Sequence, residues 1–156
     1  MDDLHVHIRA MEEGDRSLVF ALAEEVLRPL AEATGHPELF HEEEFLALME
    51  RADVWVAESP REPAELTGYV ATEVEADADC LTVRCVCINP AFEGQHVGHR
   101  LLDWAEGLAY SRGIGRLAAP LPETDRHSVG LYRAHSFVMR REEERPHMIV
   151  MEKRLR

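Results

Sequence analysis

One segment constrains this chain more than any other, because it runs from a strand through a glycine-containing turn directly into a helix. In residues 85–102, CVCINPAFEGQHVGHRLL, an apolar run stops at Asn89-Pro90, a turn with Gly94 and Gly98 follows, and helical spacing begins at Val97. The N–H groups of such a turn and of the first helical turn point the same way, and the helix dipole adds about half a positive charge there. The segment therefore predicts a pyrophosphate-sized anion site, a device that many nucleotide-binding folds share.

The remaining hydrophobic pattern predicts strands and helices on both sides of that segment. Alternation with period two indicates strands, and apolar residues three or four apart indicate helices. We expect strands at 4–10, 54–58, 66–75, 80–88, 116–119, 137–140 and 148–153. We expect helices from Asp15 to Arg28-Pro29, at 42–51, from Val97 to Gly113 and from Thr124 or Asp125 to 135, with a loop at 120–123. This order predicts a single α/β domain with a mixed sheet over residues 1–156.

The same segment resembles the acetyl-CoA-binding motif of the GNAT N-acetyltransferase superfamily. That motif follows a strand and a proline with Arg or Gln, two residues, Gly, one residue and Gly or Ala. When the family's Leu-Leu pair is placed on Leu101-Leu102, Glu93 takes the leading position, His96 the middle glycine and Gly98 the last small residue. Leading with Gln95 spoils the Leu-Leu register, so we prefer the first alignment. Glu93 is then expected to face solvent, and a positive φ at His96 would cost about 1 kcal/mol.

A second resemblance lies in residues 125–137, DRHSVGLYRAHSF. Asp125 stands where the family's second CoA motif has asparagine, Ser128 where it has alanine, and Ser136 where it has glycine. The positions that match directly are Val129, Leu131, Tyr132 and Phe137. The two motifs occur in the family's order and spacing, which makes them more specific together than either is alone.

This resemblance implies the family's fold, activity and cofactor. The fold is one layer of about seven mixed strands flanked by about four helices. The activity is acetyl transfer from acetyl-CoA to the primary amine of a small molecule, by direct attack while both substrates are bound and without a metal. The residues implied in cofactor binding are Val86, Ile88, Gln95, His96, Val97, Gly98, His99, Arg100, Asp125 and Tyr132.

The resemblance also implies a general acid, whereas the base is open. Tyr132 matches the tyrosine that protonates the leaving thiolate in many family members, and a phenol is neutral at pH 7. Glu73 is the candidate base, because it lies on a strand expected beside the CoA strand, and Glu75 shares its face. His36 and His147 are comparable candidates, and a water chain would need no single side chain.

Composition restricts the partners. A formal net charge of −13 repels nucleic acid phosphates and mildly favours a cationic acceptor such as a free amine. No apolar stretch approaches the roughly 20 residues of a membrane span. The acidic N-terminus lacks an apolar signal segment, so we expect a cytoplasmic protein.

The metal-ligating residue types form no recognisable set. The cysteines lack zinc spacing and are interpreted as small strand hydrophobes: Cys80, Cys85 and Cys87. Two histidine pairs can each share a face, His5 with His7 and His96 with His99, but no Glu or Cys completes a site around them.

Three other functions compete with a small-molecule acetyltransferase. The acceptor could instead be a protein N-terminus or a lysine. The substitutions at Glu93 and His96 could indicate a CoA-binding regulatory module with little catalysis. ATP or NAD binding is disfavoured because the sequence has neither the P-loop lysine nor the dinucleotide fingerprint. A homodimer is left open.

Overall fold

The computed structural model describes residues 6–35, 40–60, 64–142, 144–145 and 147–155. The helices are α1 (Arg16–Thr34), α2 (Glu42–Arg51), α3 (Val97–Ser111) and α4 (Arg126–Ala134). The strands are β1 (His7–Ala10), β2 (Asp53–Glu58), β3 (Leu66–Glu75), β4 (Cys80–Ile88), β5 (Arg116–Pro122), β6 (Val138–Arg141) and β7 (Met148–Arg154). Short 3₁₀ turns lie at Glu13–Asp15, Ala76–Ala78 and Pro90–Phe92.

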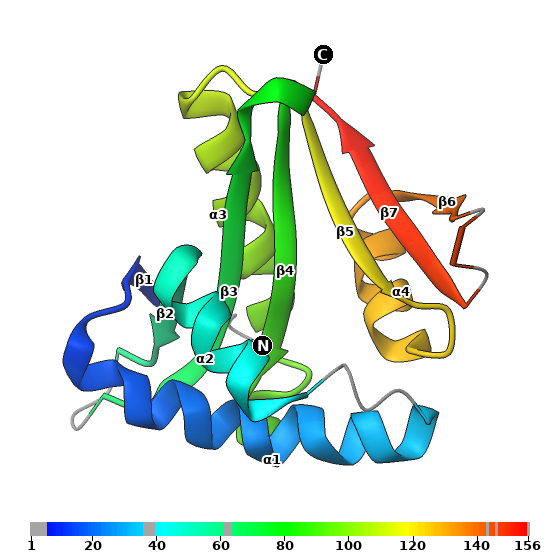
Figure 1. The fold of residues 1–156 in the computed structure, drawn as a ribbon. Coiled ribbons are helices and arrows are strands. Elements are labelled where there is room, and N and C mark those ends of the chain that lie inside the picture. Colours follow the sequence, from blue (N-terminus) through cyan, green and yellow to red (C-terminus); the bar gives the residue numbers. More distant parts are fainter. Residues whose placement is uncertain (1–5, 36–39, 61–63, 143, 146, 156) are drawn as a thin grey trace.

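The strands form one mixed sheet of seven, in the order β1-β2-β3-β4-β5-β7-β6. Each neighbouring pair is antiparallel except β4 and β5, which run parallel in the middle of the sheet. Their pairing extends only from Cys80 opposite Arg116 to Thr82 opposite Ala118. Beyond that point the two strands diverge, as Figure 1 shows. The predicted mixed α/β sheet with about four helices is confirmed, and its central opening is what positions the site.

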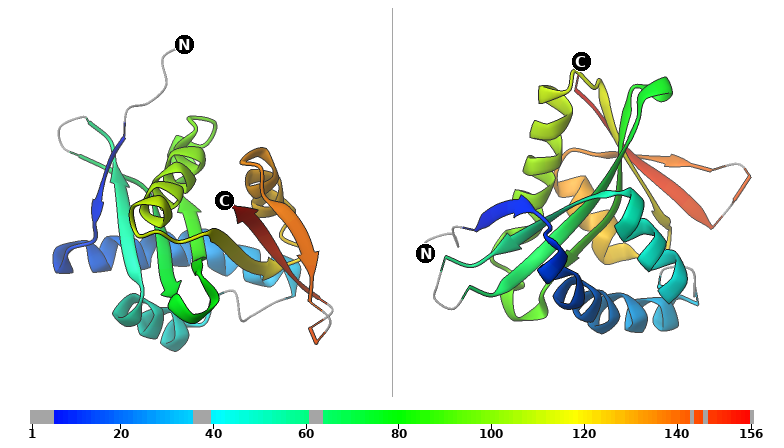
Figure 2. Two further views of the ribbon diagram at one scale, coloured as in Figure 1. Left: turned by 90° about the horizontal axis from the view of Figure 1, so that it is seen from above. Right: turned by 60° about the vertical axis from the view of Figure 1, so that its left-hand side comes forward.

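The helices cover both faces of the sheet and define two hydrophobic cores. Helices α1 and α2 lie on one face and α3 and α4 on the other, as the views in Figures 1 and 2 agree. The α3 core is the larger, with Leu81, Leu101 and Leu117 fully buried. The second core packs Val19 of α1 and Phe45 of α2 against strand residues of the other face. Side chains of the central strands point alternately into the two cores, so these strands carry hydrophobic residues on both faces.

Helix α1 is longer than the sequence predicts. We expected it to end at Arg28-Pro29, but it continues through Pro29 to Thr34. Its C-terminal residue is followed by Gly35 at φ 72°, whose N–H bonds to the carbonyl of Ala31, so the helix ends on a left-handed glycine cap. A proline inside a helix costs about 3 kcal/mol, and the burial of Ala31 to 6% exposure helps to offset that cost.

Strand β5 is also longer than predicted, and the reason bears on the site. Residues 120–123 were expected to form a loop, but Pro120 and Pro122 lie inside β5, opposite Val150 and Met148 of β7. Proline cannot donate a backbone hydrogen bond, so it is tolerated in a strand only where one side is unpaired. Because β4 has diverged at this height, β5 is a local edge here, and both prolines fit.

The other predicted elements are confirmed with small shifts at their ends. Helix α2 and strands β2, β3 and β4 match their expected ranges within a residue, and Asp125 is the N-cap of α4. The first strand begins at His7, and its predicted start at 4–6 lies largely outside the described residues. None of the described helices is both long enough and apolar enough to cross a membrane.

Candidate functional site

The diverging end of β4 exposes a backbone edge to the centre of the molecule. The Asn89 N–H bonds to the Thr67 carbonyl at 2.8 Å, which directs the Asn89 peptide group towards β3. Peptide groups alternate sides along an antiparallel strand, so those of Val86 and Ile88 point the other way. These two residues lie beyond the last pair that joins β4 to β5. Their N–H and C=O groups therefore face the opening, where an extended ligand can pair with them.

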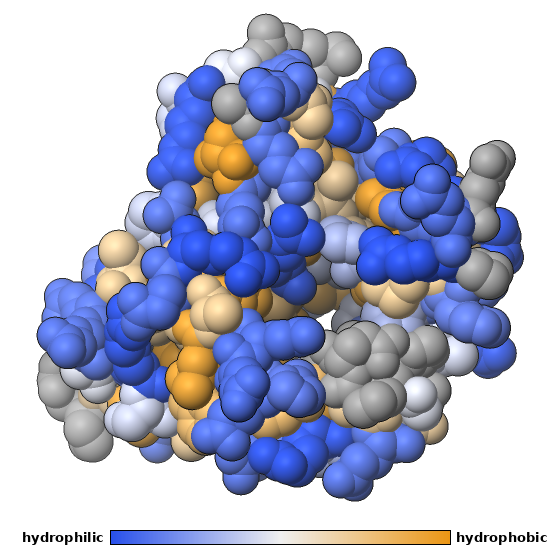
Figure 3. Space-filling model, in the orientation of Figure 1, coloured by the Kyte–Doolittle hydropathy of each residue, from blue (hydrophilic) through white to orange (hydrophobic). Residues whose placement is uncertain are grey.

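A cavity of about 390 Å³ occupies this opening. Its apolar wall comes from α1, α2, β5 and β7, and its polar groups come mainly from α2, β4 and α4. The space-filling view in Figure 3 shows a surface that is largely hydrophilic and hollowed where β4 and β5 diverge. The lining residues are Leu27, Leu30, His41, Glu44, Phe45, Leu48, Arg51, Arg84, Cys85, Val86, Pro120, Leu121, Pro122, Asp125, Ser128, Tyr132, Arg145 and Met148.

Tyr132 lines this cavity from α4 while its side chain is almost buried. It is 4% exposed and packs against Phe137, with the ring centroids 5.1 Å apart. Burial raises the pKa of its hydroxyl well above the ordinary value of 10.0, and nearby Cys85 and Asp125 act in the same direction. The phenol thus stays protonated at neutral pH and can donate a proton or a hydrogen bond into the cavity.

Cys85 faces the same cavity but is a poor nucleophile. Burial raises the pKa of its thiol to about 11, although the hydrogen bond to the Tyr69 hydroxyl opposes the shift. Burial also raises the pKa of Cys87. Since the thiolate is the reactive form, neither residue is equipped for covalent catalysis at pH 7, which agrees with their interpretation as buried strand residues.

The turn before α3 divides its amide groups into two sets. The Phe92, Glu93 and Gln95 amides bond to carbonyls within the turn, and the Ala91 amide bonds to the Asn89 side chain at 3.0 Å. The first-turn amides of α3 have no intrahelical acceptor. Within the described part of the chain, those of Val97, Gly98 and His99 bond to no other backbone carbonyl. The predicted anion site therefore excludes the amides of the preceding turn. It consists of the amides in the first turn of α3.

Two positions where the family pattern has glycine adopt left-handed backbone geometry in this chain. His96, the N-cap of α3, has φ 62°, and Ser136, just after α4, has φ 71°. Positive φ favours glycine because a Cβ atom is crowded there. At His96 the structure has the positive φ at which a side chain costs about 1 kcal/mol, and this geometry supports the alignment that places His96 on the motif's middle glycine. Glu93 is exposed, as expected.

Gly98 lies where three structural elements pack closely together. A Cβ atom built there would lie 2.8 Å from Ile88 Cδ1 and 3.0 Å from Leu131 Cδ1. The missing side chain thus lets α3 approach β4 and α4 closely, while the Gly98 amide remains in the first turn of α3. Gln95 and Arg100 are half-buried beside it.

Asp125 is both a structural cap and a cavity residue. Its carboxylate is 5% exposed and accepts the Ser128 N–H at 3.2 Å, which satisfies an amide at the start of α4. Asp125 and Tyr132 thus line the cavity from the start and from the body of the same helix.

Glu73 does not line the cavity. Its Oε1 accepts hydrogen bonds from Arg84 at 2.8 Å and from Arg51 at 3.2 Å, and Arg84 also bonds to Glu75 at 3.2 Å. Glu73 and Glu75 thus anchor two arginines of the cavity wall. That Glu73 acts as the general base stays a prediction. Its position outside the cavity lining does not favour this role. His147 is exposed on the approach to β7 and does not line the cavity, and His5 and His36 lie outside the described residues.

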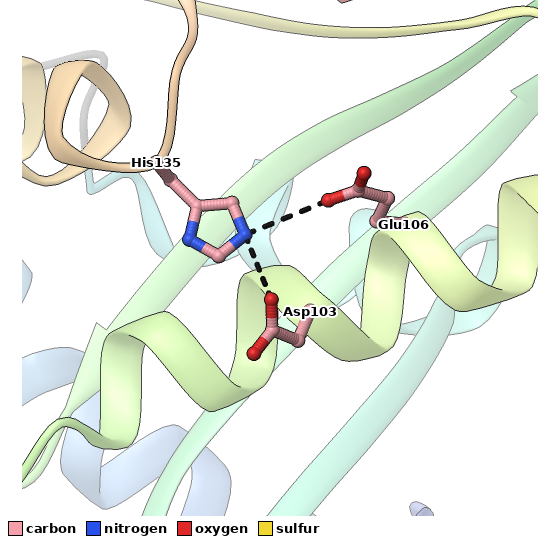
Figure 4. A group of neighbouring side chains, drawn as sticks. All are labelled: Asp103, Glu106 and His135. Atoms are coloured by element: carbon pink, nitrogen blue, oxygen red, sulfur yellow. Dashed lines mark ion pairs between the residues drawn. The ribbon is translucent and has the colours of Figure 1, made fainter. Parts of the chain in front are cut away.

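The structure assembles one cluster that the sequence interpretation missed. Asp103 and Glu106 on α3 meet His135, the residue that follows α4, as drawn in Figure 4. A signal was present, because His99, Asp103 and Glu106 recur at i, i+4 and i+7 and so share one face of a helix. His96 and His99 also lie together, with ring centroids 5.9 Å apart. The fourth partner, His135, comes from another element and has no local signal.

A mixed sheet that opens between two parallel strands, with a free helix N-terminus beside the opening, defines the fold of an acyl-CoA-dependent N-acyltransferase. Residues 19–137 match the profile of the Acetyltransferase (GNAT) family. The chain therefore belongs to the GNAT acetyltransferase family, whose members use acetyl-CoA. No curated protein matches the sequence significantly.

Solved structures support the same fold. The PaiA N-acetyltransferase of Thermoplasma acidophilum, in complex with coenzyme A, is 16% identical with a TM-score of 0.78, over 97% of this chain and 99% of that one. The ribosomal-protein-S18-alanine N-acetyltransferase of Escherichia coli is 17% identical with a TM-score of 0.72, over 97% and 94%. The N-acetylglutamate synthase of Neisseria gonorrhoeae, complexed with coenzyme A and N-acetyl-glutamate, is 25% identical with a TM-score of 0.71, over 99% of this chain and 36% of that one.

Proposed function

We propose that this protein transfers the acetyl group of acetyl-CoA to the primary amine of a small molecule, by direct attack in a complex that holds both substrates. The observation that carries the proposal is the opening between β4 and β5. Val86 and Ile88 lie beyond the last residue pair between β4 and β5 there, and Val86 and Tyr132 both line the cavity. In the proposed complex, the thioester and its general acid therefore meet at this opening.

The chain's own groups fit coenzyme A at two points. The first-turn amides of Val97, Gly98 and His99, with the dipole of α3, suit the pyrophosphate. The outward peptide groups of Val86 and Ile88 suit the amide groups of the pantetheine arm, which pairs with them as an added strand. In the proposed complex the thioester lies in the opening that Tyr132 lines, and exposed His96 and half-buried His99 flank the first turn of α3, where the phosphates bind.

The proposed reaction balances with one acid and one base. The neutral amine attacks the thioester carbon, a C–N bond forms, and the oxyanion takes hydrogen bonds from N–H groups of β4. The C–S bond then breaks, Tyr132 gives its proton to the departing thiolate, and the phenolate regains a proton from water. The proton that the amine loses goes to water or to a cavity carboxylate. Glu44 on α2 lines the cavity and is placed better for this than Glu73.

The cavity favours a small acceptor with an acidic group. Its volume of about 390 Å³ falls in the range of small-molecule sites. Three of its lining residues are arginines, Arg51, Arg84 and Arg145. Arg51 and Arg84 already bond to Glu73, so a carboxylate of the acceptor would join that network or bind Arg145, since guanidinium groups pair with carboxylates in two-point contacts. The Neisseria neighbour, complexed with N-acetyl-glutamate, supports the same choice. We therefore expect an amine of the amino-acid type.

Calorimetry with CoA followed by an acetyl-transfer assay over matched amines tests the proposal. The panel should contain amino acids, their carboxamides, simple amines and peptide N-termini. We expect CoA binding, and turnover that is highest with free carboxylates. Turnover with peptides alone would indicate a protein acetyltransferase instead. CoA binding without turnover of any amine would indicate a regulatory module.

A further inference from the structure

The cluster at the α3–α4 contact has the composition and geometry of a metal site. His135 Nε2 lies 3.0 Å from Asp103 Oδ1 and 3.6 Å from Glu106 Oε2. One nitrogen and two carboxylate oxygens, all within 4.8 Å of one another, thus converge on one point. Figure 4 shows the imidazole extending from the end of α4 towards two side chains of α3.

We propose that Asp103, Glu106 and His135 bind a divalent cation of the zinc type, which joins α3 to the end of α4. The site lies on the α3–α4 contact, away from the cavity between β4 and β5, and it goes beyond the proposed function. Zinc accepts imidazole nitrogen and carboxylate oxygen together and commonly keeps water in a fourth position. Hard cations such as Mg²⁺ prefer oxygen ligands alone.

The distances suit coordination. Ligand atoms at about 2.0–2.2 Å from a tetrahedral zinc lie about 3.3–3.6 Å from one another. The contacts of 3.0 and 3.6 Å from His135 Nε2 lie within about 0.3 Å of that range, and a small rotamer change of exposed Asp103 can adjust its distance from Glu106, which is within 4.8 Å. Asp103 is 71% exposed, so it can adjust its rotamer to the ion and leaves a route for the ion and its water to enter.

The opposite nitrogen of the imidazole supports the same interpretation. His135 Nδ1 lies 3.3 Å from His99 Nδ1, so one ring donates to the other. With a cation on Nε2, His135 keeps its proton on Nδ1 and donates it to His99. Metal-binding histidines are commonly oriented by such a bond on the second nitrogen. The His135 side chain is only 10% exposed, so its direction is set before any ion binds.

The local charge also favours a cation. Asp103 and Glu106 bring two negative charges, and Lys153 brings one positive charge, with Nζ 3.0 Å from Glu106 Oε2. His99 and His135 add none when neutral. One net negative charge remains at the cluster, within a chain of net charge −13 that attracts cations generally. Lys153 holds Glu106 in place but contacts Oε2, the same oxygen that faces His135, so the ion must share or displace that contact, which limits the affinity.

Calorimetric titration of the full-length protein with Zn²⁺, without CoA, tests the site. We expect one equivalent to bind, and His135→Gln and Asp103→Asn each to weaken that binding at least tenfold. His99→Phe removes only the orienting partner and should weaken it about tenfold. The matched control is His127→Gln, an exposed histidine of α4 outside the cluster, which should bind as the wild type does.

A second variant and a second metal probe keep the test informative if one variant is unstable. Asp103 is exposed, so its asparagine variant tests the site even where the His135 variant is unstable. With Co²⁺ as the probe, the visible absorption of a low-coordinate site should appear in the wild type and in His127→Gln but not in His135→Gln. Equal Zn²⁺ affinity in all variants, or wild-type binding weaker than about 1 mM, would overturn the proposal.

Discussion

The two ends of the β4–β5 strand pair differ in packing: one end is hydrogen-bonded and buried, and the other is open. At the paired end, Leu81 and Leu117 are opposite each other and fully buried, and Arg116 forms an ion pair with Glu152 at 3.0 Å. At the diverging end no residue of β4 pairs with β5, and the space becomes the cavity that Val86 and Tyr132 line. The fold thus concentrates stability at one end and chemistry at the other, so substitutions at the two ends should affect different measurements.

The largest expected effect concerns catalysis at the diverging end. Tyr132→Phe should lower kcat about 100-fold, because general acid catalysis contributes at least that much. The phenyl ring keeps the packing against Phe137, so the unfolding midpoint and CoA affinity should stay close to wild type. Steady-state kinetics with calorimetry checks this, and an unchanged kcat would remove Tyr132 from the acid role.

A matched pair on β4 separates the two ends by stability. Leu81→Ala at the paired end should cost about 3 kcal/mol of unfolding free energy, because it leaves a cavity in the α3 core. Val86→Ala at the diverging end is half-buried and should cost about 1 kcal/mol. Urea unfolding of both variants measures the difference. Equal losses would mean that the opening is packed as tightly as the closed end.

Backbone strain offers a third comparison. Ser136→Gly, beside Tyr132 and at φ 71°, should stabilise the protein by about 0.5–1 kcal/mol. Asp79→Gly at the paired end, where φ is 49°, should give no such gain, because the Asp79 carboxylate accepts the Gly115 amide at 3.0 Å. Thermal unfolding compares the two. A Ser136→Gly variant no more stable than wild type would contradict the strain.

The smallest expected effect is the reactivity of the cavity thiol. With a pKa of about 11, Cys85 is about one-thousandth thiolate at pH 8, so alkylation of the native protein should be slow. The thiolate fraction grows as pH rises towards that pKa, so labelling should accelerate tenfold for each pH unit up to about 11. Mass spectrometry after timed iodoacetamide treatment measures the rate. Rapid modification of Cys85 at pH 8 would contradict the raised pKa of its thiol.

The sequence predicted well wherever a local pattern decides the structure. Alternation located the strands, and the two motifs located the first turn of α3 and Tyr132. It failed where tertiary context overrides a local rule. Pro29 breaks an isolated helix but lies within α1, and Pro120 and Pro122 indicate a loop until β5 is recognised as a local edge.

The same limit explains the candidate sites. The α3 half of the metal cluster was readable as a stripe of His99, Asp103 and Glu106, but His135 reaches it only through the packing of α4. Glu73 was assigned from its strand neighbours, yet the arginines that bind it lie on α2 and β4. Conversely, Pro120 and Pro122 could have indicated the opening, because prolines inside a central strand require that one side of the strand be unpaired.

Amide NMR during titration with CoA tests the central claim most directly, because that claim concerns particular N–H groups. The account predicts that the largest shifts fall on Val97, Gly98 and His99 at the start of α3 and on Val86 and Ile88 of β4. The Leu81 and Leu117 amides at the paired end should scarcely move. Saturating CoA that leaves those five signals in place, or that shifts the paired end instead, would contradict it.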